Sequence, residues 1–191
     1  LSGPGTPDPV IAASPNGNYL ITWSSDGQDG SGEGVFAQLF SSNDMKIGNE
    51  IAINSSTASE QTYPDAAFFS DGSFIVTWQT SDSNNSGIAA QLFTSTGAKI
   101  GSEFIVNTTT AGAQRVPSLA ILSDDTALIT FSGYQHGGNS AYDIFGQKIS
   151  KSGSFVGSEF QVNIDSSGNE STSDIVQLAN GNLLVAYHDS S

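Results

Sequence analysis

The carboxylates are the side chains of this sequence whose types and spacing could support chemistry. Glu50, Glu103 and Glu159 recur at nearly constant spacing, and two carboxylates that face one substrate can hydrolyse a glycosidic bond. Because each of these glutamates occupies the same place in a repeated pattern, we interpret them as structural groups that make one backbone contact per repeat. Asp124-Asp125 breaks that symmetry, but it lies at a predicted turn, which is a poor place for a catalytic pair.

Other catalytic arrangements are missing from the sequence. It contains no cysteine, no His-Glu-x-x-His and no Gly-x-Ser-x-Gly, so thiol nucleophiles, thiolate metal centres and two common hydrolase motifs are excluded. The histidines are His136 and His188. We interpret both as solvated loop residues, although imidazole is the usual acid–base group near neutral pH. The sequence therefore predicts no catalytic residue, and we expect the protein not to be an enzyme.

One glycine-rich loop could hold a metal ion. Asp26, Asp29 and Glu33 lie within residues 24–34 among several glycines, and calcium prefers about six to eight oxygen ligands of this kind. The loop lacks the aspartate alternation and the later bidentate glutamate of an EF-hand. A calcium site here is one prediction, a plain solvated loop is the other, and no further cofactor is expected.

A second loop could bind a ligand. Tyr134, His136 and Tyr142 lie in the segment that is unique to the third repeat, and variable loops on a rigid scaffold tend to carry function. Exposed aromatic rings in such a loop suit a carbohydrate. The repeated aromatic residues of the strands are better explained as core.

The charge balance limits the partners. The 191 residues include 19 Asp and Glu against 5 Lys and Arg, a net charge of −14. Nucleic acid is excluded as a partner because phosphate neutralisation requires many Lys and Arg side chains, and an anionic membrane surface is excluded for the same reason. No apolar run approaches the ~20 residues that a membrane-spanning helix needs. We expect an extracellular or cell-surface protein.

The elements that position these residues come in repeats. Each unit contains a short apolar segment, an Asn-Gly or Asp-Gly turn in three of four copies, a β-branched and aromatic segment, and two further strand-like segments. Such turns are strong hairpin signals. The third unit has Asp124-Asp125 at this place, so we expect a looser turn there. No segment has a helical period. The units cover residues 9–54, 64–107, 117–163 and, in part, 173–191.

This pattern predicts an all-β repeat protein of four-stranded antiparallel units in a single domain, residues 1–191. A β-propeller-like arrangement of about three and a half blades best explains why the inner strands of the repeats are apolar on both faces. An open stack of β-sheets is the alternative. Open sheet edges invite pairing with another chain, so we expect either a longer natural array or completion by neighbouring chains.

The repeats resemble a known class. The motif written as Thr77-Trp78, Gln91-Leu92-Phe93 and Gly101-Ser102-Glu103-Phe104 is similar to the tandem repeats of about 50 residues in large secreted or surface-attached bacterial proteins, often described as adhesin-like. The resemblance implies a non-enzymatic structural or adhesive module that self-associates or binds other surface proteins. A carbohydrate-binding, lectin-like propeller is the second hypothesis and a glycosidase the third.

Overall fold

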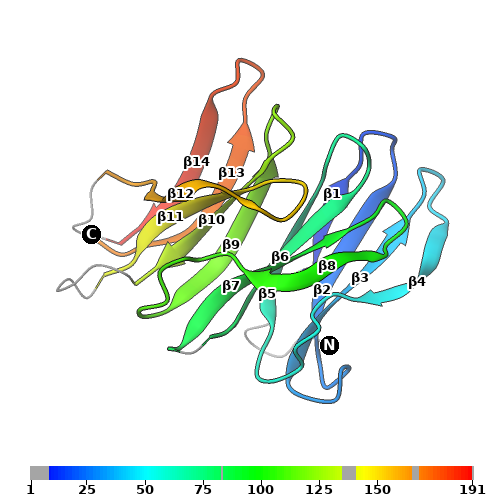
Figure 1. Ribbon diagram of the computed structural model, residues 1–191, viewed down its shortest axis with the longest axis horizontal. Coiled ribbons are helices and arrows are strands. Elements are labelled where there is room, and N and C mark those ends of the chain that lie inside the picture. Colours follow the sequence, from blue (N-terminus) through cyan, green and yellow to red (C-terminus); the bar gives the residue numbers. More distant parts are fainter. Residues whose placement is uncertain (1–8, 83, 135–140, 165–167, 191) are drawn as a thin grey trace.

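The computed structural model describes residues 9–82, 84–134, 141–164 and 168–190, and in this part of the chain every regular element is a β-strand (Figure 1). No helix in these ranges could cross a membrane. The strands of the first unit are β1 (Val10–Ala13), β2 (Tyr19–Asp26), β3 (Glu33–Phe40) and β4 (Lys46–Ala52). Those of the second are β5 (Thr62–Phe68), β6 (Phe74–Ser81), β7 (Ser86–Phe93) and β8 (Lys99–Ile105). The remainder are β9 (Gln114–Ile121), β10 (Ala127–Gly133), β11 (Asp143–Ile149), β12 (Phe155–Gln161), β13 (Glu170–Gln177) and β14 (Leu183–Asp189).

The strands form antiparallel meanders, one for each repeat. Three sheets have four strands, in the orders β1-β2-β3-β4, β5-β6-β7-β8 and β9-β10-β11-β12, and β13 pairs with β14 alone. The first strands of successive sheets, β1, β5, β9 and β13, contact one another in turn, so they form the inner edge of an arc of sheets (Figure 1). The predicted all-β, propeller-like fold is confirmed, with no sheet closed on itself in the described part of the chain.

The hairpin that follows each inner strand is the same tight turn in all four units. Gly17, Gly72 and Gly181 adopt positive φ there, and Asp125 takes the equivalent place with φ 61°. The backbone bonds of the Asp125 turn, Leu122 N to Thr126 O at 2.8 Å and Asp125 N to Leu122 O at 2.9 Å, repeat those of the Gly72 turn. The prediction of a looser turn at Asp124-Asp125 is therefore wrong, because aspartate tolerates the left-handed region better than most residues.

The apolar core lies between neighbouring sheets. One repeated position on the second strands carries Trp23, Trp78, Phe131 and Tyr187. Trp78 is 1% exposed and Phe131 is fully buried, since each faces a complete neighbouring sheet. Trp23 is partly buried, and Tyr187 is 41% exposed on β14. The aromatic side chains at this one repeated position thus bury very different amounts of apolar area in the four units.

Repeated polar side chains fasten the strands. Asn54 Oδ1 accepts a hydrogen bond from Val35 N at 2.8 Å, and Asn107 and Asn163 make the same bond in their own units. Glu103 accepts from Ser56 N at 3.1 Å, and Glu159 accepts from Thr108 N at 2.7 Å, in each case from the preceding unit. These two glutamates make backbone contacts between units, as predicted. Glu50 does not, since its Oε1 accepts from the Gln28 side chain instead.

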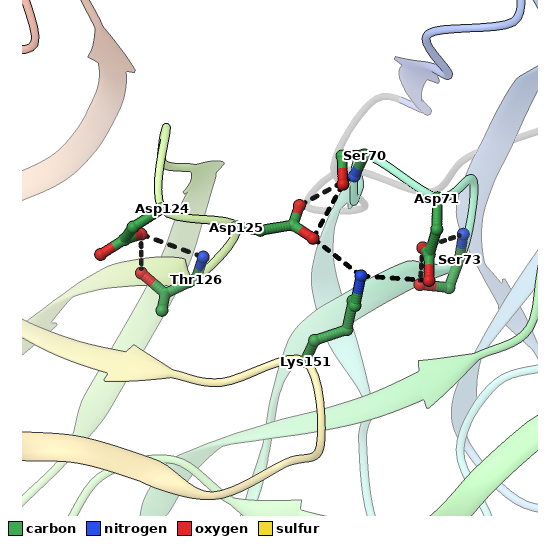
Figure 2. Close-up of polar contacts among 7 residues, drawn as sticks. All are labelled: Ser70, Asp71, Ser73, Asp124, Asp125, Thr126 and Lys151. Carbon is green, nitrogen blue, oxygen red and sulfur yellow. Dashed lines mark hydrogen bonds and ion pairs between the residues drawn. The ribbon is translucent and has the colours of Figure 1, made fainter.

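A cluster of charges joins the hairpin turns of the second and third units (Figure 2). Lys151 Nζ, on the β11–β12 turn, lies 3.1 Å from Asp71 Oδ2 and 2.8 Å from Asp125 Oδ2. Asp125 also accepts hydrogen bonds from Ser70 N at 2.8 Å and Ser70 Oγ at 2.9 Å. Hydrogen bonds from Ser73, with help from Lys151, lower the pKa of Asp71 to about 2. Lys151 is the largest cause of the lowered pKa of Asp125.

Replacing Lys151 with Gln is expected to destabilise the protein at neutral pH and to have little effect near pH 2. A lowered folded-state pKa stabilises the fold above the ordinary value near 3.8, and this contribution disappears as the pH falls toward about 2. Urea unfolding of the wild type and of Lys151→Gln at several pH values measures the difference. Lys46→Gln removes an equal charge from another unit as a control. A difference that stays constant from pH 7 to pH 2 would contradict this account.

Candidate functional site

A pocket of about 500 Å³ opens at the end of the sheets opposite to the Figure 2 cluster. It lies where the inner strands β5 and β9 begin and where β6 and β10 end. Its walls include backbone and side chains from the second and third units, among them Tyr63, Gln79, Asn85, Arg115, Val116 and Tyr142. Its volume falls in the range of about 300–1,000 Å³ that is usual for small-ligand sites.

Irregular inner strands shape this pocket. Tyr63, Val116 and Thr172 occupy equivalent places before Pro64, Pro117 and Ser173, and all three have positive φ, between 45° and 53°. The register of each inner strand shifts at this place, as in a β-bulge, which re-aims side chains at the edge of a sheet. Positive φ is unusual for a β-branched residue such as Val116. The bulges place Tyr63 and Val116 on the pocket wall, and Val116 N donates to Gln79 Oε1 at 3.3 Å.

The third-unit loop contributes one predicted ligand-binding residue to this pocket. Tyr142 lines it, and Arg115 lies over the Tyr142 ring with its guanidinium carbon 5.4 Å from the ring centre. Tyr134, which is 39% exposed, packs edge-on against Tyr142 with 5.5 Å between the ring centres. His136 lies outside the described residues. His188 is exposed on β14 and not in a loop.

The residues of the predicted calcium loop are only partly brought together. Asp26 and Glu33 are paired across β2 and β3, and burial, followed by the charges of Glu60 and Asp26, raises the pKa of Glu33. Asp29 is engaged with other groups: its Oδ2 accepts from Asn54 Nδ2 at 3.1 Å and its Oδ1 from Ser31 N at 3.2 Å. Within the described ranges no three His, Cys, Asp or Glu side chains gather as metal ligands would. Calcium binding stays a prediction.

Two further carboxylates stand on the inner strands, and the sequence reasoning missed them. Asp65 on β5 and Asp174 on β13 occupy the same place in their units, where β1 has Val10 and β9 has Ser118. Asp65 Oδ1 accepts from Ala66 N and Oδ2 from Leu119 N, both at 2.8 Å. The carboxyl is partly buried, and this desolvation outweighs the hydrogen bonds, so its pKa rises to about 6.

Asp174 is connected to Asp65 through the intervening unit. Asp174 Oδ1 accepts from Ile175 N at 2.8 Å and lies 3.5 Å from Ser118 Oγ. Ser118 also hydrogen-bonds to Asp65, and the negative charge of Asp174 adds to the rise in the pKa of Asp65. Asp174 is exposed, whereas Asp65 is partly buried. The inner strands thus hold two carboxyl groups in different environments on either side of one hydroxyl.

Neither carboxylate lines the pocket, but both follow pocket-lining residues on the same inner strands, and Asp174 follows Ser171. Tyr63 and Val116, on the pocket wall, precede Asp65 and Ser118 by two residues on the same strands. The signal in the sequence was the residue that follows Pro9, Pro64, Pro117 and Ser173, which is Val, Asp, Ser and Asp in turn. This difference between units breaks the repeat symmetry more strongly than Asp124-Asp125 does. It indicates a pair of nearby carboxylates only when the inner strands are known to be adjacent.

Several solved structures share this fold. An endo-arabinase from Bacteroides thetaiotaomicron VPI-5482 aligns with 94% of this chain and 69% of its own at a TM-score of 0.62 and 14% identity. A thermostable family-43 glycoside hydrolase aligns with 95% of this chain and 64% of its own, with TM-score 0.61 and 12% identity. A protein of unknown function from Dyadobacter fermentans DSM 18053 has TM-score 0.67 and 9% identity over 95% of this chain and 61% of its own. No family model and no curated protein sequence matches the chain.

The shared class is therefore an all-β, propeller-like fold, and this chain spans about two thirds of the length of the structures that share it. At 9–14% identity the likeness establishes the fold. The fold is the one on which an endo-arabinase and a family-43 glycoside hydrolase are built.

These comparisons correct two predictions. The expected non-enzymatic structural or adhesive module is wrong, and so is the expectation that the protein is not an enzyme, because the structures that share the fold include glycoside hydrolases. Self-association through open sheet edges stays a prediction.

Proposed function

We propose that this chain is part of a propeller-type glycoside hydrolase, in which Asp65 and Asp174 are the acid–base pair and the neighbouring pocket holds the glycan. The observation that carries the proposal is the pair itself: two carboxyl groups on inner strands, one of them with a pKa raised to about 6. Pairs of titratable groups in unlike environments are typical of acid–base sites. Polymeric glycans are met outside the cell, so the extracellular placement expected from the sequence belongs to this proposal.

The chemistry assigns a role to each carboxyl. Both oxygens of Asp65 accept backbone N–H bonds, and each oxygen retains a second lone pair that can carry the proton. Near pH 6 about half of the Asp65 groups are protonated, so Asp65 is the general acid that protonates the leaving glycosidic oxygen. Asp174, the more exposed group, acts on the other side of the bond, either on a water molecule or on the sugar carbon itself.

Replacing Asp65 or Asp174 with Asn is expected to reduce glycoside hydrolysis by roughly 10²–10⁴-fold. Release of reducing sugar from arabinan, xylan and polygalacturonate by the wild type and by Asp65→Asn and Asp174→Asn measures the effect. Hydrolysis by the wild type should also fall as the pH rises above about 6, because Asp65 then loses its proton.

Asp71→Asn is the matched control, since Asp71 lies in a turn at the opposite end of the sheets and should keep full activity. Failure of the wild type to release sugar from any of the three polymers would refute the proposal. Equal rates in the wild type and both inner-strand variants would refute the assignment of Asp65 and Asp174.

A further inference from the structure

We infer that the pocket at Arg115 recognises the carboxylate of an acidic sugar, so that the glycan is a uronic-acid-containing chain. This inference rests on the proposed function and names the substrate class of that site. Three observations support it: Arg115 has no ion-pair partner in the described part of the chain, the Tyr142 ring positions it, and polar side chains line the rest of the pocket.

Arg115 is the only arginine among the five cationic side chains of the sequence. In the described part of the chain its guanidinium has no carboxylate within ion-pair distance, whereas Lys151 is paired with two. In a protein with 19 acidic side chains, a cation in a pocket without an internal partner is open to an anion of the ligand. Arginine suits this task because its planar fork binds a carboxylate through two parallel hydrogen bonds.

Tyr142 holds the guanidinium in place. The cation lies over the face of the ring at 5.4 Å, an arrangement that the negative face of the ring stabilises. The Tyr142 ring is itself supported by Tyr134, and Tyr142 N donates to Asn169 Oδ1 at 3.1 Å. An arginine positioned in advance loses less side-chain entropy when it binds an anion.

The other pocket walls suit sugar hydroxyl groups. Gln79, Asn85 and Ser132 provide amide and hydroxyl groups, which can both donate and accept hydrogen bonds. Glu60 also lines the pocket, and its Oε2 is already used by Glu33 N at 3.0 Å. The pocket lining thus combines one cation, Arg115, and one carboxylate, Glu60, with neutral polar groups, and Arg115 is the group that can pair with the carboxylate of a sugar ring.

The overall charge of −14 repels an acidic polymer at long range. At an ionic strength of about 0.15 M the Debye length is about 8 Å, so the direct contact with Arg115 outweighs the screened charges elsewhere. Binding should therefore be measured at that ionic strength and not in dilute buffer.

The test compares trigalacturonate with its methyl ester, which has the same size but no charge, by calorimetric titration at pH 7. We expect the wild type to bind trigalacturonate about ten- to a hundredfold more tightly than the ester, as a hydrogen bond between charged groups implies. Arg115→Gln should remove this preference, and Arg115→Lys should retain part of it. Lys46→Gln changes the net charge equally, outside the pocket, and should bind as the wild type does.

Equal binding of the acid and the ester by the wild type would overturn the inference, and this comparison does not depend on whether a variant folds. A preference for the acid that survives in Arg115→Gln would overturn it as well. Hydrolysis of neutral polymers without acid preference would leave the proposed function standing alone. Acid-selective binding at Arg115 without hydrolysis of any polymer would support the binding site and refute the catalytic role of Asp65 and Asp174.

Discussion

Replacing Trp78 with Ala is expected to lower the free energy of unfolding by about 3–5 kcal/mol. Trp78 is 1% exposed and belongs to the core between the first two sheets, packed among residues from both units. The first and second sheets could not collapse fully into the space left behind, because their backbones are fixed by the ladder hydrogen bonds. Phe131, fully buried between the second and third sheets, should show a loss of similar size. Urea unfolding measures both.

The repeat supplies its own controls for this prediction. Tyr187 holds the same position in the fourth unit and is 41% exposed, so Tyr187→Ala should cost under about 1 kcal/mol, as is usual for surface substitutions. Trp23 is partly buried, and Trp23→Ala should fall between the two. A loss at Tyr187 as large as that at Trp78 would mean that β14 is covered in solution.

The free energy of unfolding is expected to fall by about 2 kcal/mol as the pH rises from about 4 to about 6, owing to Asp65. Its folded-state pKa is about 6 against an ordinary value of 3.8. Within this window the folded protein binds a proton that the unfolded chain has already lost. Raising the pH therefore favours the unfolded state. Asp71 and Asp125 have lowered pKa values, so their effect has the opposite sign and lies at lower pH.

Asp65→Asn isolates this contribution because the amide does not titrate. Between pH 4 and pH 6 the unfolding free energy of the wild type should fall relative to that of Asp65→Asn, and well above pH 6 the two curves should run parallel. Asp174→Asn should shift the wild-type transition toward lower pH, since it removes one of the charges that raise the pKa of Asp65. Parallel curves for the wild type and Asp65→Asn over the whole range would show that Asp65 titrates normally.

The two ends of the sheets differ in what they hold. The hairpin end carries the network of Lys151, Asp71 and Asp125, which joins the second and third units through charged and hydroxyl groups. The other end carries the pocket, the bulged inner strands and the single arginine. The charged groups of this network pair with one another, whereas in the described part of the chain Arg115 at the pocket end has no carboxylate within ion-pair distance.

The fold followed from local patterns that the sequence displays directly. Asn-Gly and Asp-Gly pairs mark the hairpins, β-branched and aromatic segments mark the strands, and the regular spacing of the units gives one sheet for each repeat. The backbone contacts of Glu103 and Glu159 also followed from their repetition, whereas Glu50 in the first unit hydrogen-bonds to the Gln28 side chain. The looser turn expected at Asp125 did not form. The backbone hydrogen bonds of the hairpin hold Asp125 in the conformation that glycine adopts in the other units.

The candidate site could not be predicted in the same way. Asp65, Ser118 and Asp174 lie more than 50 residues apart in the chain, and only the packing of β5 against β9 and of β9 against β13 places their side chains together. The raised pKa of Asp65 depends on burial, which no residue type encodes by itself. Arg115 and Tyr142 meet because a bulged inner strand and a third-unit loop end at the same rim. The sequence by itself determined the strands, the turns and their repetition, because hydrogen bonding and side-chain alternation act over a few residues. Only the tertiary structure decided which unlike residues of different repeats face one another, because desolvation and charge coupling act through space.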